Sequence, residues 1–157
     1  ISWIRLCVVW SNMKLGIPDR IHRINYLSSE IDSIYHQATL KIGLTDSSSR
    51  VLYTICDNGG ECQLSDIYKL TGIRKQTVNS AIRGLEKDEV IYLKNNDGRS
   101  KKVILTDKGK ALSKETVFRL FELENRVFSA WSEHELDLYI ELTEKFIDLF
   151  RKEMNSI

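Results

Sequence analysis

The chain has 157 residues, of which 42% are apolar and 29% charged, with one proline and a net charge of +1. This length predicts one domain, or one compact unit with appendages, and it suffices to bury a core without disulfides or metal. The composition excludes a disordered chain, and no apolar run is long enough for a transmembrane helix. Three cysteines do not make a disulfide framework, which favours a protein of the reducing cytoplasm.

The first twelve residues form a short apolar segment that is interrupted by Arg5. A secretory signal peptide would need a basic region before its apolar run and a small-residue cleavage site after it, and neither is present. We interpret residues 1–12 as an extension introduced by cloning or by reading upstream of Met13, which we expect to be the natural start. The alternative is a native segment that packs on dimerisation helices.

The next part of the chain has the periodicity of two helices. Residues 19–43 predict a long amphipathic helix, and a second helix is expected from Thr45 or Asp46 to a stop at residues 58–60. The apolar positions of the first helix alternate between spacings of three and four residues, as in a heptad seam. These positions are Ile24, Leu27, Ile31, Ile34 and Ala38.

Two short helices joined by a glycine-containing turn follow, which is the signature of a helix-turn-helix. The first covers about residues 64–70, with Leu64, Ile67 and Leu70 on one side. The second covers about residues 75–87, and its opposite face is polar. Burial is expected for the apolar stripe of the second helix, which consists of Val78, Ala81, Ile82 and Leu85.

A polar, basic hairpin is expected after these helices. Two β-rich runs, residues 90–93 and 103–105, flank a connection of Asn, Asp and Gly residues. Residues 74–102 carry eight basic and four acidic side chains, a net charge of +4, whereas residues 103–157 carry a net charge of −3. A nearly neutral chain with such a basic patch can bind a polyanion.

The C-terminal third predicts two further helices. Thr106 is expected to cap a helix that continues to about Trp131, and residues 132–135 match a capping box that starts another. The predicted helix-turn-helix and the hairpin together form a winged helix, which does not need such long terminal helices for its own core. The apolar stripes of the terminal helices must therefore pack on each other or on a second copy of the chain. The last stripe consists of Leu136, Tyr139, Ile140, Thr143, Phe146, Ile147 and Phe150.

Three short motifs of the central segment carry a resemblance. They are residues 85–91 (LEKDEVI), residues 97–99 (DGR) and residues 105–109 (LTDKG), and their order and spacing resemble the winged-helix signature of the MarR family. The resemblance extends from Met13 to Ile157. It implies a mainly α fold with a small β-hairpin wing, namely a winged helix-turn-helix with long N- and C-terminal dimerisation helices. The expected parts are 13–43 (N-terminal dimerisation helix), 44–106 (winged helix-turn-helix) and 107–157 (C-terminal dimerisation helices).

The resemblance also implies a function. Such proteins are homodimeric transcription regulators, more often repressors than activators, that bind double-stranded DNA at pseudo-palindromic operators. The second helix of the motif would enter the major groove, and Arg99 would enter the adjacent minor groove, braced by Asp97. Many members release DNA when a small aromatic or phenolic effector, a metal or an oxidant acts. The sequence departs from the family pattern at Arg74, Glu89 and Leu93, where a capping residue, a glycine and a basic residue are usual.

Nine residues are predicted to contact DNA. Glutamine and asparagine can pair bidentately with adenine, and arginine with guanine, so Gln76, Asn79 and Arg83 are expected nearest the bases. Phosphate contacts are expected from Lys75, Thr77 and Ser80. Strand alternation places Lys101 and Lys102 on opposite faces, so that one of these two lysines is expected to face a phosphate. The alternative is a solvated helix face and a charged hairpin that keeps a sheet edge soluble. The remaining candidates are Lys75, Thr77, Ser80, Arg99, Lys101 and Lys102.

Catalytic, cofactor and metal motifs are not found in the sequence, so an enzyme is not expected. The three histidines have no partner at a metal-ligand spacing. Cys56 lies near the apolar side of its helix, so we expect it to be buried and structural. The alternative is a redox switch, which would need a partly exposed thiol of depressed pKa. Several aromatic residues either belong to the core or line an effector crevice: Tyr26, Tyr35, Tyr53, Phe128 and Trp131.

The alternative function is a winged-helix module that binds another protein without specific DNA binding. The substitution Arg99→Ala separates the two functions, because it would weaken DNA binding strongly and leave binding of a protein partner nearly untouched.

Overall fold

The computed structural model describes residues 19–96 and 100–157. The predictions for residues 1–12, Met13, Asp97 and Arg99 lie outside these described residues. The chain divides into two compact units, Ile1–Asp46 and Ser47–Ile157, which we describe one at a time.

The first unit contains the helix α2 (Asp19–Lys41), close to the expected range. The side chains at its predicted heptad positions Ile24, Leu27, Ile31 and Ile34 are 45–55% exposed. In the last turns of the helix, Thr39 Oγ1 donates a hydrogen bond to Asp46 Oδ1 at 2.6 Å, and His36 Nδ1 lies 2.8 Å from Asp46 Oδ2. These contacts fix the turn that ends α2.

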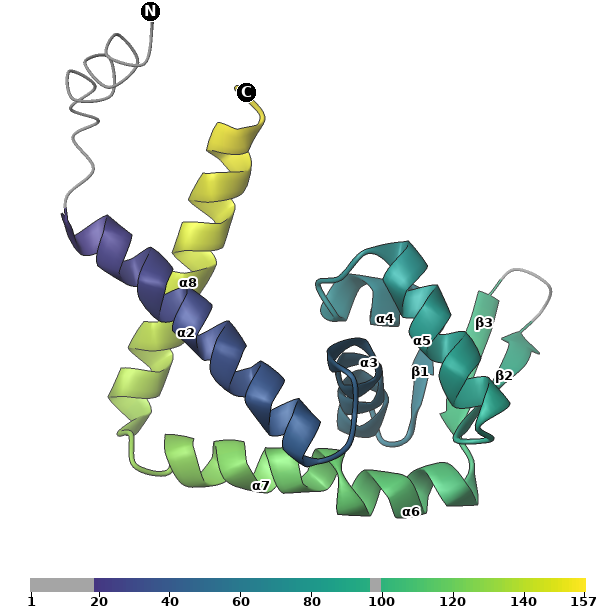
Figure 1. Ribbon diagram of the computed structural model, residues 1–157. Helices are drawn as coiled ribbons and strands as arrows, with labels where there is room; N and C mark the ends of the chain where they lie inside the picture. The colour runs from purple at the N-terminus through teal and green to yellow at the C-terminus, as the bar shows by residue number, and fades with distance from the viewer. Residues whose placement is uncertain (1–18, 97–99) are drawn as a thin grey trace, which may run out of the picture. The chain divides into compact units, whose positions relative to one another are not determined.

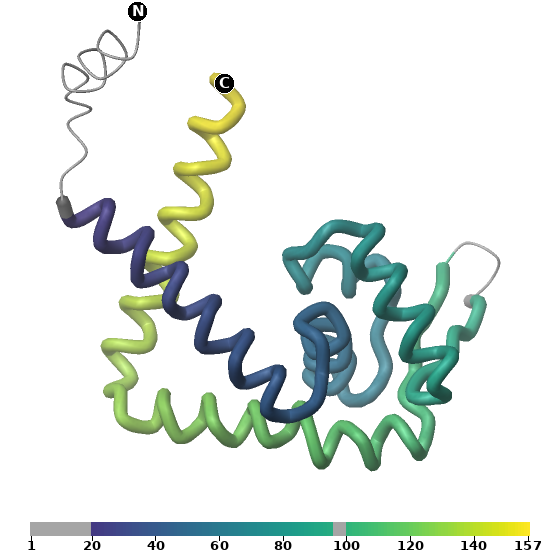
Figure 2. The backbone as a smooth tube through the Cα atoms, viewed as in Figure 1, coloured from purple at the N-terminus to yellow at the C-terminus, as the bar shows by residue number. Residues whose placement is uncertain are grey.

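The second unit is built on three helices packed against a small sheet, as Figures 1 and 2 show. The helices are α3 (Asp46–Asp57), α4 (Leu64–Leu70) and α5 (Lys75–Lys87). The strands β1 (Glu61–Gln63), β2 (Ile91–Asn96) and β3 (Ser100–Leu105) pair antiparallel in the order β1-β3-β2. The helices and the sheet enclose a core of fully buried side chains, which includes Leu52, Ile55, Ile67, Val78 and Val103.

The helix-turn-helix matches its prediction closely. The helices α4 and α5 have the expected bounds, and all four residues of the apolar stripe of α5 are buried. Of the three apolar residues predicted on one side of α4, Ile67 is buried, whereas Leu70 is 63% exposed. The strand β1 was not predicted, because a three-residue strand at the edge of a sheet has too short a pattern to be recognised.

The expected single helix over residues 107–131 is also wrong, because the chain forms α6 (Asp107–Glu115) and α7 (Val117–Phe128). Between them Thr116 has φ −125° and ψ −87°, outside the helical region. Its hydroxyl donates to the carbonyl oxygen of Leu112 at 2.7 Å, a local bond that competes with the helix ladder. Since neither glycine nor proline marks this position, the break carries no strong sequence signal.

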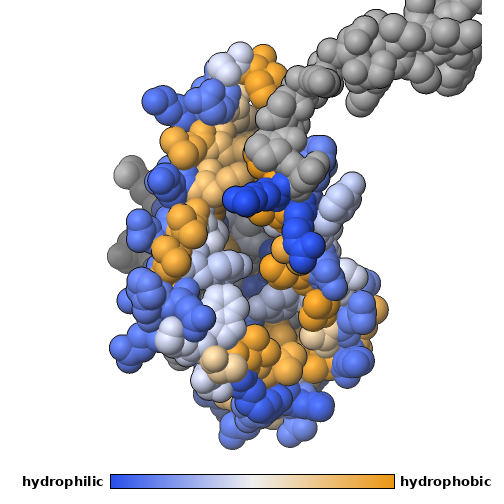
Figure 3. Space-filling model, turned by 90° about the vertical axis from the view of Figure 1, so that its left-hand side faces the viewer, coloured by the Kyte–Doolittle hydropathy of each residue, from blue (hydrophilic) through white to orange (hydrophobic). Residues whose placement is uncertain are grey.

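The last helix, α8 (Glu133–Met154), begins at the predicted capping box. The Ser132 hydroxyl accepts from the N–H of Glu135, and the Glu135 carboxylate accepts from the N–H of Ser132. None of the 22 residues of α8 is buried. Apolar side chains therefore reach the surface of the molecule between charged ones, as Figure 3 shows.

The structure is mainly helical, with one small antiparallel sheet, which confirms the predicted winged-helix class. Among the described residues, no helix is both long and apolar enough to cross a membrane.

Candidate nucleic-acid interface

The helix α5 buries one side and presents the other to solvent. Its apolar stripe packs in the core, whereas Gln76, Thr77, Ser80 and Arg83 are exposed. This division follows from the helical period, because residues three and four apart share a face. Four of the six predicted contact residues on α5 thus lie together on one accessible polar surface.

The N-terminal end of α5 leaves backbone donors unsatisfied. Arg74 precedes the helix in an extended conformation, and its side chain caps no N–H group within the described chain. The first N–H groups of a helix have no partner within the helix and attract anions. Lys75 and Thr77 are exposed at this end, an arrangement suited to a phosphate.

Asn79, which is half-buried, differs from the other polar residues of α5. Its Oδ1 accepts a hydrogen bond of 2.6 Å from the hydroxyl of Tyr68 on α4. The ammonium group of Lys75 lies 4.9 Å from the centroid of the Tyr68 ring. The sequence analysis did not identify Tyr68, because no spacing rule joins side chains on two different helices.

The two neighbouring lysines of β3 have different surroundings. Lys102 forms an ion pair with Glu61 of β1, and its side chain is only 27% exposed. Lys101 is exposed and has no ion pair among residues 19–96 and 100–157. Of the two lysines, Lys101 is thus the one whose ammonium group is available to a phosphate, while Lys102 already has a carboxylate partner.

The turn between α5 and the wing forms without the glycine that is usual in the family. Glu89 adopts φ +57°, a conformation that costs a residue with a side chain more than it costs glycine. Its carbonyl oxygen accepts a 2.6 Å hydrogen bond from the Thr106 hydroxyl, which also accepts from the N–H of Gly109. Thr106 therefore ties the start of the wing to the start of α6.

The structure explains why glycine stands at position 109, the last residue of the motif in residues 105–109. A Cβ atom at this position would lie 2.0 Å from the carbonyl oxygen of Val90. The backbone of α6 thus approaches the strand entry more closely than any other residue type permits. This close approach holds the wing against the helical part of the domain.

The two cysteines described here do not have the properties of a redox switch. Burial raises the pKa of the Cys56 thiol, although a hydrogen bond with Ser113 opposes the shift. Burial and the nearby Asp66 carboxylate both raise the pKa of Cys62. Cys56 is half-buried rather than buried as expected, and Cys62 is buried.

The aromatic residues considered for an effector crevice fall into different settings. Tyr53 packs edge-on against Phe121, and its hydroxyl donates to Glu124 Oε2 at 2.8 Å, so this tyrosine joins α3 to α7. Phe128 and Trp131 form another edge contact. Tyr53 is thus part of the packing of the second unit.

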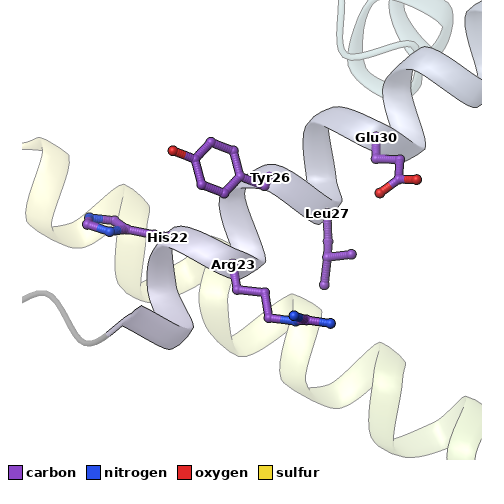
Figure 4. A pocket seen from close by; sticks show the side chains of 5 residues that line it. All are labelled: His22, Arg23, Tyr26, Leu27 and Glu30. Carbon is purple, nitrogen blue, oxygen red and sulfur yellow. The ribbon is translucent and has the colours of Figure 1, made fainter.

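A shallow hollow on α2 includes Tyr26 and is lined by side chains of this one helix, as Figure 4 shows. Tyr26 projects from one side of the helix, and Leu27 and Arg23 project from another. One helix alone does not enclose a ligand. Within the described part of the chain, no group of three or more His, Cys, Asp or Glu side chains could hold a metal ion.

The arrangement of α3, α4, α5 and the wing defines a winged helix-turn-helix domain. Residues 42–100 match the model of the MarR family, and no curated protein matches the chain. The winged-helix segment of this chain thus resembles the MarR family, to which solved transcriptional regulators of similar fold belong.

Solved structures share the fold over most of the chain. A MarR family regulator from Neisseria meningitidis is 20% identical, with a TM-score of 0.72 over 85% of this chain and 97% of its own. A MarR/EmrR family regulator from Acinetobacter sp. ADP1 is 18% identical, with a TM-score of 0.71 over 87% and 99%. BpsR of Bordetella bronchiseptica, whose DNA binding is regulated by 6-hydroxynicotinic acid, is 24% identical, with a TM-score of 0.63 over 82% and 98%.

Proposed function

We propose that this protein is a homodimeric repressor of transcription that binds a pseudo-palindromic operator in double-stranded DNA. The observation that carries the proposal is the accessible polar face of α5, which is held rigidly by a buried apolar stripe. The major groove of B-DNA is wide enough for an α-helix, and its base edges differ in their donors and acceptors. The α5 face offers such groups in Gln76 and Arg83.

The other predicted contacts have distinct roles in this proposal. Lys75, Thr77 and Ser80 surround the base-reading residues and would bind phosphates, which position the helix without specifying sequence. Lys101 of the wing, which forms no ion pair with any described residue, would bind the neighbouring DNA backbone, whereas Lys102 would have to leave Glu61 first. For Arg99 in the minor groove and Asp97 as its brace, the support is the family resemblance.

A second copy of the chain is the proposed partner of the terminal helices. The apolar side chains of α8 are largely exposed, including Phe146 at 56% and Phe150 at 59%. A two-fold dimer would cover such a stripe and would present two α5 helices to successive major grooves. Because operator DNA is the proposed ligand, we place the protein in the cytoplasm, and we assign it no catalytic activity and no cofactor.

A small-molecule effector is part of the proposal by analogy with BpsR. An aromatic acid that binds one arrangement of the dimer more tightly would shift the population toward that arrangement. A change in the separation of the two α5 helices would then abolish their match to the grooves. If the free and the effector-saturated dimers bound DNA equally well, this step would be wrong.

The experiment that tests the function is selection from a randomised duplex pool at low and at high salt. We expect enrichment of an inverted repeat with half-sites about 10 bp apart, and an affinity that falls steeply as salt rises. Arg83→Ala should cost about 1–3 kcal/mol of discrimination at one base pair of each half-site. Arg126→Ala, which removes an exposed arginine from α7, is the matched control and should leave the selected sequence unchanged.

Recovery of no enriched sequence would contradict the proposal. Binding that is weak and independent of sequence would favour the alternative of a module that binds another protein.

A further inference from the structure

We propose that Tyr68 sets the base preference of α5 by holding Asn79 so that Asn79 directs its amide donors toward DNA. Asn79 then selects a base whose major-groove edge carries acceptors, and it rejects cytosine. This inference rests on the proposed function, because it assigns a sequence preference to one residue of the same surface.

The hydrogen bond between Tyr68 and Asn79 fixes the orientation of the Asn79 carboxamide. The Tyr68 hydroxyl donates to Asn79 Oδ1 at 2.6 Å, a short hydrogen bond. Asn79 is half-buried, and among the described residues its amide nitrogen Nδ2 has no hydrogen-bond partner. Since Oδ1 and Nδ2 are bonded to the same carbon, an Oδ1 that faces Tyr68 leaves Nδ2 facing away from α4.

Lys75 reinforces this orientation. Its ammonium group lies 4.9 Å from the centroid of the Tyr68 ring, within the range of a cation–π contact. A cation over the ring draws electron density from the phenol, which makes the hydroxyl a better donor and a poorer acceptor. The oxygen of the Asn79 carboxamide is therefore favoured as the partner of Tyr68 over the nitrogen.

The orientation of the carboxamide decides which bases Asn79 favours, because the bases differ in the donors and acceptors on their major-groove edges. A free asparagine prefers adenine, because its nitrogen donates to N7 while its oxygen accepts from N6. Because Tyr68 occupies one of the two lone pairs of Oδ1 and turns this atom toward α4, the second of these bonds is weakened. Guanine offers two acceptors, N7 and O6, and thymine offers O4, whereas cytosine offers only an N4 donor. The held Asn79 thus favours guanine or thymine over adenine and disfavours cytosine most.

The test compares sequence profiles selected from a randomised duplex pool by the full-length protein and its variants. Asn79→Ala should remove discrimination at one base pair in each half-site, which identifies the position that Asn79 contacts. Tyr68→Phe keeps the ring under Lys75 and removes only the hydroxyl. At the identified position it should shift the preference from guanine or thymine toward adenine by about tenfold, the scale of one good bidentate contact.

Two controls show that the hydroxyl acts through Asn79. In the double variant Tyr68→Phe/Asn79→Ala, the profile should equal that of Asn79→Ala alone, because Tyr68 has no carboxamide left to hold. Tyr92→Phe removes another tyrosine hydroxyl, on an exposed side chain of β2, and should leave the profile unchanged. A ¹⁵N–¹H spectrum of each variant checks that the fold is retained.

The outcomes separate this inference from the proposed function. If the unmodified protein enriches no sequence, the proposed function and the inference both fall. If it enriches an operator but Tyr68→Phe leaves the profile unchanged, the inference alone is overturned. Loss of affinity in Asn79→Ala by the same factor on every sequence would also overturn the inference, because it would mean a phosphate contact.

Discussion

The helices α5 and α8 are both amphipathic, yet their apolar stripes have opposite fates. In α5 the four apolar side chains of the stripe are at most 7% exposed, because α4 and the sheet cover them. In the longer α8, not one residue is buried. Periodicity alone therefore identifies a stripe but does not identify what covers it. One helix belongs to a core within the chain, and the other leaves its apolar stripe largely exposed.

This comparison separates two kinds of substitution. Changes in the winged helix should alter the free energy of unfolding of a single chain, whereas changes on α8 should alter self-association. The experiments below test that separation in order of decreasing effect.

The largest contrast is expected between two leucines. Leu52 of α3 is fully buried, and Leu52→Ala should cost about 2–5 kcal/mol, because it leaves a cavity in the core. Leu149 of α8 is 53% exposed, and Leu149→Ala should change the stability of the winged helix by less than about 0.5 kcal/mol. Urea denaturation measures the first effect, and sedimentation shows whether Leu149→Ala weakens self-association. Equal losses of stability would contradict the separation.

The next contrast uses one substitution at two glycines. At Gly109 a Cβ atom would clash with the Val90 carbonyl oxygen, so Gly109→Ala should destabilise the protein by about 1–3 kcal/mol or more. At Gly84, within α5, the Cβ would meet nothing within 4 Å, so Gly84→Ala should stabilise by about 1 kcal/mol. Thermal unfolding should show midpoints that shift in opposite directions. A shift of the same sign would refute the proposed close approach of α6.

A smaller difference is expected between two helix caps. Thr106 caps α6 and also holds the Glu89 carbonyl, so Thr106→Ala should cost about 0.5–2 kcal/mol of winged-helix stability. Ser132 caps α8, and Ser132→Ala should lower the helicity of α8 while the winged helix keeps its stability. Hydrogen exchange, resolved by residue, measures both effects. Faster exchange in α5 of the Ser132 variant would show that the two regions are coupled.

The smallest effect is a dependence on pH. The N–H and hydroxyl groups of Ser132 hold the pKa of Glu135 below its ordinary value of 4.5. A lowered pKa in the folded state contributes stability that is present above the ordinary value and is lost as the pH falls through the lowered one. The capping box of α8 should therefore weaken in acid. A ¹³C titration of the carboxyl group measures the pKa, and in Ser132→Ala it should return toward 4.5.

Local patterns predicted much of the winged helix. The bounds of α4 and α5 followed from apolar spacing and from the glycine-containing turn, and Ser132 and Thr106 were recognisable as caps. The break at Thr116 was missed, because it depends on a local hydroxyl bond in a sequence that otherwise favours a helix. The spacing of Leu70 places it on one side of α4 with Ile67 but does not decide its exposure, which depends on its neighbours in space.

The polar contacts of the candidate interface depend on tertiary structure. Tyr68 and Asn79 are 11 residues apart on different helices, and Lys102 and Glu61 are 41 residues apart on paired strands. Residue types and spacing did not show that Asn79 and Lys102 already have hydrogen-bonding or ionic partners. Only the packing of α4 on α5, and the register of β1 on β3, showed that these two side chains already have partners.

The sequence by itself determined the class of the domain, the polar face of α5 and the positions of the glycines, because these depend on local periodicity and backbone conformation. The tertiary structure decided which polar groups remain free to bind and why Gly109 admits no side chain. It also showed that no residue of α8 is buried among the described residues. Those properties depend on distances between segments that are far apart along the chain, and no pattern within one segment contains them.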